Sequence, residues 1–262
     1  MTTVTTEIDS RGVATLTLNR PEKHNALDGA TMAELDAALT KIASDPKARL
    51  VVLTGAGASF CAGADIGHMR SMLTMTEEQN IADAQVLAKL LRKLDELELP
   101  IIARVNGNAF GGGVGLIACA DIAIGVSSAK FALTEVRLGI VPAAISPYVV
   151  AAIGSRQARR LFLTAAPFTA AEAQQLGLLH LSADESGLDE LVQAQIGHLL
   201  RGGPAALRAA KQLVRRVAHF HDRGVLADET ARLLARLRVS PEGKEGLSAF
   251  LERRKSAWSP QD

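Results

Sequence analysis

Two segments of the chain repeat one plan, and this repeat limits the folds that the sequence can adopt. Each passes from an apolar run to a glycine turn, a phenylalanine, a glycine-rich corner and a helix-like stretch: "VVLTGAGASFCAGADI" and "ARVNGNAFGGGVGLIA". Short apolar runs stopped by glycine are typical of strands buried on both faces of a parallel sheet. Strand ends built alike would present two backbone corners at one sheet edge, where open α/β folds bind ligands. Two ordinary tight turns would explain the same spacing.

The first part of the chain alternates strands with helices, which predicts an α/β fold with mainly parallel strands. The predicted strands are Val13–Pro21, Leu50–Gly57, "PIIARVNG" and "DIAIGV". Amphipathic helices are predicted over "DGATMAELDAALTKIA", with Asp28 as cap, and over Glu77–Glu98. The apolar stripe of the second helix comprises Ile81, Leu87, Leu90, Leu91, Leu94 and Leu97.

From Ser155 onward the pattern becomes helical. Ser155 and Thr169 suit helix starts, and Gly177 suits a helix stop. Pro204 begins a basic helix, and Ser240 caps another that has Pro241 in its first turn. We therefore divide the chain into an α/β core over 1–200 and a C-terminal helical region over 201–262.

Composition excludes several classes of protein. The formal net charge of +1 gives no overall field directed to nucleic acid or to a membrane surface. Cys61 and Cys119 lie in apolar stretches, which indicates reduced, buried thiols and a cytoplasmic protein. The first residues lack the apolar centre of a signal peptide, and no apolar run is long enough to cross a membrane.

The glycines between Gly107 and Gly115 require a reason, because glycine loses more backbone entropy on folding than any other residue. Neither a triphosphate-binding loop nor the dinucleotide fingerprint fits, since the lysine of the first and the third glycine of the second are missing. An oxyanion site fits better. It needs free backbone N–H groups that converge on one oxygen, and two glycine corners can supply them.

Other catalytic templates fit poorly. No G-x-S-x-G elbow is present, and the histidines show no metal-ligand spacing, so no metal is expected. His219 and His221 are interpreted as a solvated surface pair. The acid–base candidates are carboxylates in apolar stretches, where burial raises the pKa: Asp65, Asp121 and Glu135.

At these residues the sequence resembles the crotonase (enoyl-CoA hydratase/isomerase) superfamily. The motifs occur in order along nearly the whole chain: "LNRPEKHNAL", "VVLTGAGASFCAGADI", "PIIARVNGNAFGGGVGLIACADIAIG", "AKFALTEVRLGIVPA", "FTAAEAQQLGLLH" and "EGLSAFLERRKSAW". The resemblance implies a spiral of ββα units and a C-terminal helical region that makes homotrimers, often paired into hexamers. It also implies an acyl-CoA substrate and no separate cofactor, because coenzyme A enters as part of the thioester.

Site residues follow from the resemblance position by position. The N–H groups of Ala64 and Gly112 would stabilise the enolate oxygen, and Glu135 would match one of the two glutamates of the hydratases. The other glutamate is replaced here by Gly115. A structural ion pair with Arg137 is the alternative for Glu135. Substrate and coenzyme A contacts would come from His24, Asn25, Ala26, Ala62, Asp65, Ile66, Gly111, Tyr148, Phe250 and Lys255.

A narrower resemblance concerns two segments, "FGGGVGLIACADIAI" and "EVRLGIVPAAISPYVV". Together they are similar to the bacterial branch of 3-methylglutaconyl-CoA and isohexenylglutaconyl-CoA hydratases. This resemblance implies addition of water to a 3-substituted glutaconyl-CoA, in leucine or acyclic terpene degradation. Tyr148 would bond the substrate or complete the core. Arg70, Arg137 or His68 would pair with the distal carboxylate of the substrate.

Other functions stay open at this point. A single glutamate would also suit double-bond isomerisation, and decarboxylation is a further option. Basic residues in 201–238 raise the possibility of RNA binding, although a solvated or intersubunit helix face explains them, and no nucleic acid partner is expected. They are Arg208, Lys211, Arg215, Arg216, Arg232, Arg236 and Arg238. A catalytically inactive family member is the last alternative.

Overall fold

The larger of two sheets carries the predicted parallel strands. The computed structural model describes residues 2–218, 220 and 222–259, so His219 and His221 lie outside the described residues. The strand order is β1-β2-β3-β5-β7-β10, and only the β1–β2 pair is antiparallel. The bounds are Val4–Ile8, Val13–Leu18, Leu50–Gly55, Ile101–Val105, Ile122–Val126 and Leu181–Ala183. The α/β prediction is confirmed.

A second sheet consists of short strands in the order β4-β6-β8-β9. Their bounds are Ser59–Cys61, Asn108–Phe110, Lys130–Ala132 and Phe168–Thr169. β4, β6 and β8 run parallel, and β9 closes the sheet in the antiparallel sense. This sheet brings the two glycine-rich corners of the sequence side by side.

The repeat found in the sequence is a ββα unit. A long strand in the larger sheet, a short strand in the smaller sheet and a helix follow one another in β3-β4-α2 and again in β5-β6-α4. A third unit follows the same plan with β7, β8 and α5, and a 3-10 turn, η2 (Glu135–Leu138), lies between β8 and α5. Consecutive units place their long strands as neighbours in one sheet and their short strands as neighbours in the other. The corners are therefore repeated structural positions.

Helices pack over the core as the apolar stripes predict. Asp28 caps α1 through Thr31, and Leu35, Leu39 and Ile42 of this helix are fully buried. In α3 the stripe is buried only toward the C-terminal end, because Ile81 is half exposed. The helices over the core are α1 (Gly29–Ser44), α2 (Ile66–Met72), α3 (Glu77–Glu96), α4 (Gly112–Ala118), α5 (Ser146–Thr164), α6 (Ala170–Leu176) and α7 (Leu188–Leu200). A further 3-10 turn, η1 (Pro21–Lys23), follows β2.

Several helix boundaries follow the predicted capping residues. Thr169 begins α6 with a capping box, and Gly177 ends that helix in the left-handed conformation. Ser155 differs from the prediction, since it lies inside α5 directly after Gly154, whose φ of 75° interrupts the helix. Helix α5 therefore consists of two pieces, the first of which begins beside α4.

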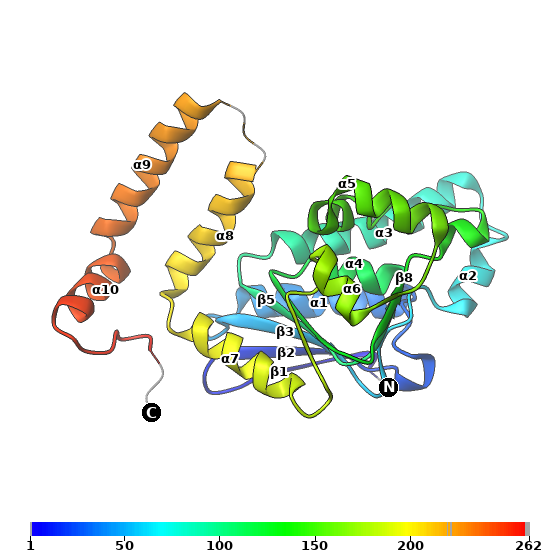
Figure 1. Ribbon diagram of the computed structural model, residues 1–262, viewed down its shortest axis with the longest axis horizontal. Helices are drawn as coiled ribbons and strands as arrows, with labels where there is room; N and C mark the ends of the chain where they lie inside the picture. The colour runs from blue at the N-terminus through cyan, green and yellow to red at the C-terminus, as the bar shows by residue number, and fades with distance from the viewer. Residues whose placement is uncertain (1, 219, 221, 260–262) are drawn as a thin grey trace.

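The C-terminal helices stand apart from the layered core at the left of Figure 1. They are α8 (Pro204–Ala218), α9 (Arg223–Val239) and α10 (Pro241–Leu251), and Ser240 caps α10 as predicted. Exposed apolar side chains gather on them, including Val214, Leu234, Leu247 and Phe250. The division of the chain at residue 200 into two domains stays a prediction.

Both cysteines are free and buried, as predicted. Burial raises the pKa of the Cys61 thiol to about 12, so this sulfur is protonated at neutral pH. Among the residues that the structure describes, no helix has the length and the apolar character needed to cross a bilayer.

Candidate active site

The two glycine corners meet where β4 and β6 end. Ser59 pairs with Asn108 and Cys61 with Ala109, so the chain leaves both strands at the same level. Gly63 has a φ of 88°, and a Cβ at this position would lie 2.9 Å from the Phe110 carbonyl oxygen and 3.8 Å from the Gly112 nitrogen. Only glycine allows this conformation and this approach. The corner before α2 therefore touches the corner before α4.

Ala64 lies in a backbone bridge that fixes the direction of its peptide groups. The Leu27 N–H donates to the Gly63 carbonyl oxygen (2.7 Å), and the Asp65 N–H donates to the Leu27 carbonyl oxygen (2.9 Å). Because successive N–H groups of an extended segment point to opposite sides, the Ala64 N–H points away from Leu27. It is a backbone donor on the exposed side of this corner.

Gly112 is the first residue of α4, after Gly111 as N-cap. The first N–H groups of a helix have no partner within the helix, so the Gly112 N–H is a second donor at the corner. Gly111 has a φ of 47° and its own N–H donates to the Ala132 carbonyl oxygen (2.9 Å), which fixes the turn against β8.

The Glu135 carboxylate lies against the same turn. It is the first residue of η2, and a Cβ on Gly111 would lie 3.1 Å from Glu135 Oε1. Glu135 Oε2 is buried and has no hydrogen-bond partner among the described residues. Burial raises the pKa of this carboxyl group above its ordinary value. Glu135 and Gly112 are thus brought together around Gly111.

The alternative explanation for Glu135, an ion pair with Arg137, is wrong for this chain. Arg137 Nη2 donates to the Ala165 carbonyl oxygen (2.9 Å), and the described residues contain no ion pair of Glu135. A half-buried carboxylate with one oxygen that accepts no hydrogen bond and a raised pKa is suited to proton transfer near neutral pH.

The position of Gly115 is closed by an apolar neighbour. A Cβ on Gly115 would overlap Ile145 Cγ2 and lie 2.8 Å from Ile145 Cβ. The Ile145 side chain is only 2% exposed and belongs to the main core, and Leu91 contacts the same position from α3. A longer side chain at residue 115 therefore has no room while Ile145 is present.

The other two acid–base candidates do not share the environment of Glu135. Burial tends to raise the pKa of Asp65, but hydrogen bonds from the Gly67 and His68 N–H groups and from Arg20 bring it below its ordinary value. The expectation of a raised pKa is wrong here, because Asp65 caps α2. Asp121 lies just before β7, at the opposite end of the strand from the corners, and accepts from the Ile101 N–H and Lys211 Nζ.

The predicted coenzyme A loop lies beside the first corner. The Ala62 N–H donates to the His24 carbonyl oxygen (2.9 Å), and His24 Nδ1 is 3.0 Å from Ser59 Oγ. Asn25 is buried, and its Nδ2 donates to the carbonyl oxygens of Ala56 and Ser59. Asn25 thus ties the loop to β4 instead of facing a ligand.

Ala26 ends this loop, and Ile66 lies just after the Ala64 corner. Ala26 is buried, whereas Ile66, at the start of α2, is largely exposed and free to contact a ligand.

Two predicted contacts, Phe250 and Lys255, lie in the C-terminal helical region and not at this site. Tyr148, in the first turn of α5, packs against the main core, and burial raises the pKa of its hydroxyl. Phe250 is 81% exposed on α10. Lys255 follows α10, a helix that lies at the far side of Figure 1 from α2 and α4. Within one chain, α10 stands apart from the corner and from Glu135.

The three side chains predicted to pair with a distal carboxylate of the substrate differ in whether they already have a partner within the chain. His68 Nε2 is 3.1 Å from Asp83 Oδ1, and Arg137 is bonded to a carbonyl oxygen. Arg70 is exposed on α2, close in sequence to the Ala64 corner.

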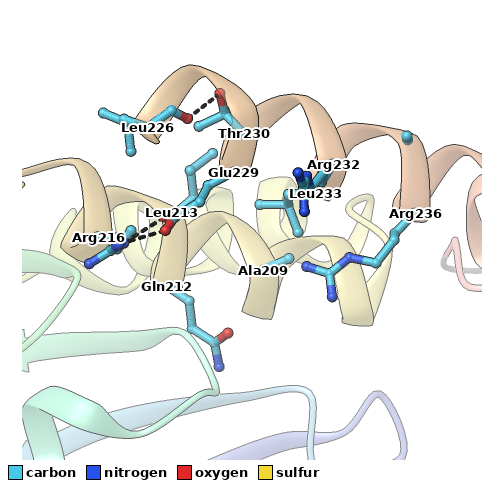
Figure 2. Close-up of a pocket in the computed structure, with 11 residues that line it drawn as sticks. Ala209, Gln212, Leu213, Arg216, Leu226, Glu229, Thr230, Arg232, Leu233 and Arg236 are labelled. Atoms are coloured by element: carbon cyan, nitrogen blue, oxygen red, sulfur yellow. Dashed lines mark hydrogen bonds and ion pairs between the residues drawn. The ribbon is translucent and has the colours of Figure 1, made fainter. Parts of the chain in front are cut away.

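A cavity of about 710 Å³ lies between α8 and α9 (Figure 2), two helices that stand apart from the core that carries the glycine corners (Figure 1). Arg216 forms an ion pair with Glu229 at 2.7 Å across it. Lys211 pairs with Asp121, and Arg215 with Asp95. Three of the seven basic side chains named above are thus paired with acids of the same chain, which favours the structural explanation over RNA binding.

One residue of the corner was missed from the sequence. Arg20 contacts Ala26, Asp28 and Asp65 with its guanidinium group. The available signal was an arginine at the end of a strand, close before an aspartate that caps a helix.

The comparison with known families agrees with this geometry. The model of the enoyl-CoA hydratase/isomerase family matches residues 9–261. The chain belongs to this family. A crystal structure of an enoyl-CoA hydratase from Shewanella pealeana is 41% identical with a TM-score of 0.94, over 98% of this chain and 96% of the other. The predicted crotonase fold is therefore confirmed.

Among its relatives, the chain is 35% identical to the crotonyl-CoA hydratase of Syntrophomonas wolfei over 93% of each chain. The 2,3-dehydroadipyl-CoA hydratase of Escherichia coli is 33% identical over 92% of this chain and 93% of its own.

Proposed function

We propose that this protein is an acyl-CoA hydratase that adds water to a 3-substituted glutaconyl-CoA. The observation that carries the proposal is the Glu135 carboxylate, which is half-buried, has a buried Oε2 without a hydrogen-bond partner and lies against the glycine corner. The leading substrate is 3-methylglutaconyl-CoA, which would give 3-hydroxy-3-methylglutaryl-CoA. Isohexenylglutaconyl-CoA is the alternative within the same class.

In the proposed reaction, the ionised Glu135 takes a proton from water as the water oxygen bonds to the β-carbon. The electrons of the double bond move through the α-carbon to the thioester oxygen. The N–H groups of Ala64 and Gly112 stabilise this enolate, and one such donor contributes about 2.7–4 kcal/mol. Glu135 then returns its proton to the α-carbon, which completes the hydroxyacyl thioester.

The closed position at Gly115 supports a reaction with one protein carboxylate. Ile145 occupies the space, so Glu135 serves both proton transfers, or the distal carboxylate of the substrate takes one of them. A relative named for 2,3-dehydroadipyl-CoA, a thioester with a distal acid, supports a substrate that carries a second carboxylate. Arg70 is the candidate cation for that acid. No separate cofactor is proposed.

The test is a screen of crotonyl-, 3-methylglutaconyl- and isohexenylglutaconyl-CoA with the product mass measured. Hydration adds the mass of one water, and we expect it with a glutaconyl thioester in preference to crotonyl-CoA. A product with the mass of the substrate would instead indicate isomerisation, and loss of carbon dioxide would indicate decarboxylation. Failure with all the thioesters would overturn the enzymatic proposal.

Isomerisation is the second candidate, because it needs a single carboxylate to move a proton between two carbons. The same half-buried Glu135 carboxylate supports isomerisation. The product mass and the position of the double bond separate the two reactions.

A further inference from the structure

Arg20 lies at the centre of an ion-pair cluster behind the Ala64 corner. Its side chain is only 14% exposed. Nη1 is 2.9 Å from Asp28 Oδ2 and donates to the Ala26 carbonyl oxygen at 2.8 Å. Nη2 donates to Asp65 Oδ2 at 3.0 Å. One guanidinium group therefore holds the coenzyme A loop and the starts of two helices.

The two aspartates divide their oxygens in the same way. Oδ1 of Asp28 caps α1 by accepting from the Thr31 N–H at 2.8 Å, and Oδ1 of Asp65 caps α2 by accepting from the Gly67 N–H at 2.7 Å. The Oδ2 atoms of both face Arg20. The planar fork of arginine suits this arrangement, whereas a lysine would present a single point charge.

Removal of this guanidinium would leave two carboxylates facing each other in a largely buried place. Burial, opposed by the hydrogen bonds from Thr31 and by the Arg20 charge, leaves the pKa of Asp28 below its ordinary value, so both groups are ionised at neutral pH. Repulsion between them would move the start of α2. Since Asp65 directly follows Ala64, the Ala64 N–H would change direction with it.

We propose that Arg20 is a positioning residue that fixes the direction of the Ala64 N–H toward the thioester oxygen. The inference rests on the proposed function, because it assumes that an acyl-CoA oxygen binds at this corner. It requires no contact between Arg20 and the substrate. Because the guanidinium is planar, its bonds to Asp28 and Asp65 fix the orientation of these two groups relative to each other.

The test measures the carbonyl stretching frequency of butyryl-CoA, labelled with carbon-13 at the thioester carbonyl and bound to the protein. Hydrogen bonds from the two N–H groups lower this frequency. R20Q should reverse a large part of this shift, and R20K should reverse a smaller part. The kcat of R20Q should fall at least about tenfold, toward the roughly 10²–10³-fold loss in kcat that follows removal of a whole donor.

The matched control is R104Q. Arg104 is 26% exposed and also makes an arginine–aspartate ion pair, with Asp189 at 2.6 Å, but it does not contact the corner. We expect R104Q to keep the wild-type frequency and kcat. Thermal unfolding of each variant checks the fold, and R20K keeps a positive charge if R20Q does not fold.

Two outcomes distinguish the failures. A wild-type protein that binds butyryl-CoA without any frequency shift would overturn the proposed function. A wild-type shift that persists in folded R20Q and R20K would overturn the role of Arg20 alone.

Discussion

At the scale of single residues, the chemistry of this protein depends on where one carboxylate has been placed. Glu135 lies against Gly111, whose lack of a side chain leaves space for Oε1. Its other oxygen is buried without a hydrogen bond. Such a group is costly to ionise in the folded protein, and the same cost makes it a stronger base near neutral pH.

The first prediction concerns turnover. E135Q keeps the shape of the side chain but cannot accept or return a proton, so kcat should fall by at least about a hundredfold. Steady-state kinetics with the substrate found in the screen provide the measurement. E190Q is the control, since Glu190 is exposed on α7 and should tolerate the same change. Near-normal turnover in E135Q would remove Glu135 from the mechanism.

The pH dependence of hydration follows from the direction of the pKa shift. Hydration begins with ionised Glu135, so kcat/KM should fall as pH decreases through the raised pKa of this group. The midpoint should lie above the value of about 4.3 for an ordinary glutamate. A profile of kcat/KM against pH measures it, and a midpoint at or below that ordinary value contradicts the assignment.

The same shift predicts an effect on stability. Because the folded pKa is above the unfolded one, the favourable contribution of Glu135 is present below the unfolded pKa and is lost as pH rises through the folded pKa. The unfolding temperature of E135Q minus that of wild type should therefore be larger at pH 8 than at pH 4. Thermal unfolding at the two pH values tests this difference.

In the same experiment, the stability of D65N relative to wild type should change with pH in the opposite direction. The folded pKa of Asp65 is lowered, so its contribution is present above the unfolded pKa and is lost as pH falls. D65N should be destabilised at neutral pH. If the unfolding temperatures of both variants changed with pH in the same way, the raised pKa of Glu135 and the lowered pKa of Asp65 would be contradicted.

The sequence predicted some residues of this site better than others. Glu135 could be predicted because its motif is local and occurs in order with the others. The environment of Asp65 could not, since its neighbours in sequence are apolar while its charge partner, Arg20, lies 45 residues earlier. Ile145 was missed as the neighbour of Gly115 for the same reason, because helix packing brings them together.

At the scale of elements, the contact between α4 and the start of α5 decides what residue 115 can be. Strands, caps and the ββα repeat could be predicted, since apolar runs and capping residues act locally. The interruption of α5 at Gly154 could not, because a glycine with positive φ leaves no distinctive signal inside a helical pattern.

The next prediction tests this contact. G115A would place a methyl group against Ile145, and overpacking of this kind costs about 1–3 kcal/mol in the free energy of unfolding. I145A should recover part of the loss in the double variant. G197A is the control, since the space around Gly197 in α7 is open and alanine favours a helix. Equal stability of G115A and wild type in urea unfolding would refute the contact.

At the scale of the whole molecule, the C-terminal helices expose several apolar side chains, among them Val214, Leu234 and Phe250. We predict that a homotrimer or hexamer covers them and places Phe250 and Lys255 near the active site of a neighbouring subunit. Sedimentation measures the oligomeric state.

Phe250 allows a direct test of a contact between subunits. If it contacts the coenzyme A part in a neighbouring subunit, F250A should raise KM about tenfold, as expected for burial of an aromatic side chain, and leave kcat nearly unchanged. L251A is the control, because Leu251 is 78% exposed beside Phe250, which is 81% exposed. Equal KM values for F250A and wild type would exclude this role.

The bridge between Leu27 and Ala64 has a consequence for how the site can be altered. Both proposed donors are main-chain N–H groups, so every amino acid except proline carries them at positions 64 and 112. Side-chain replacement at these positions changes the surroundings of the donors without removing them. Deletion of one donor without the constraint of a proline ring would require an ester bond in place of the peptide bond, made with an α-hydroxy acid. In this protein the groups proposed to bind the enolate are thus encoded by the path of the chain more than by the identity of its residues.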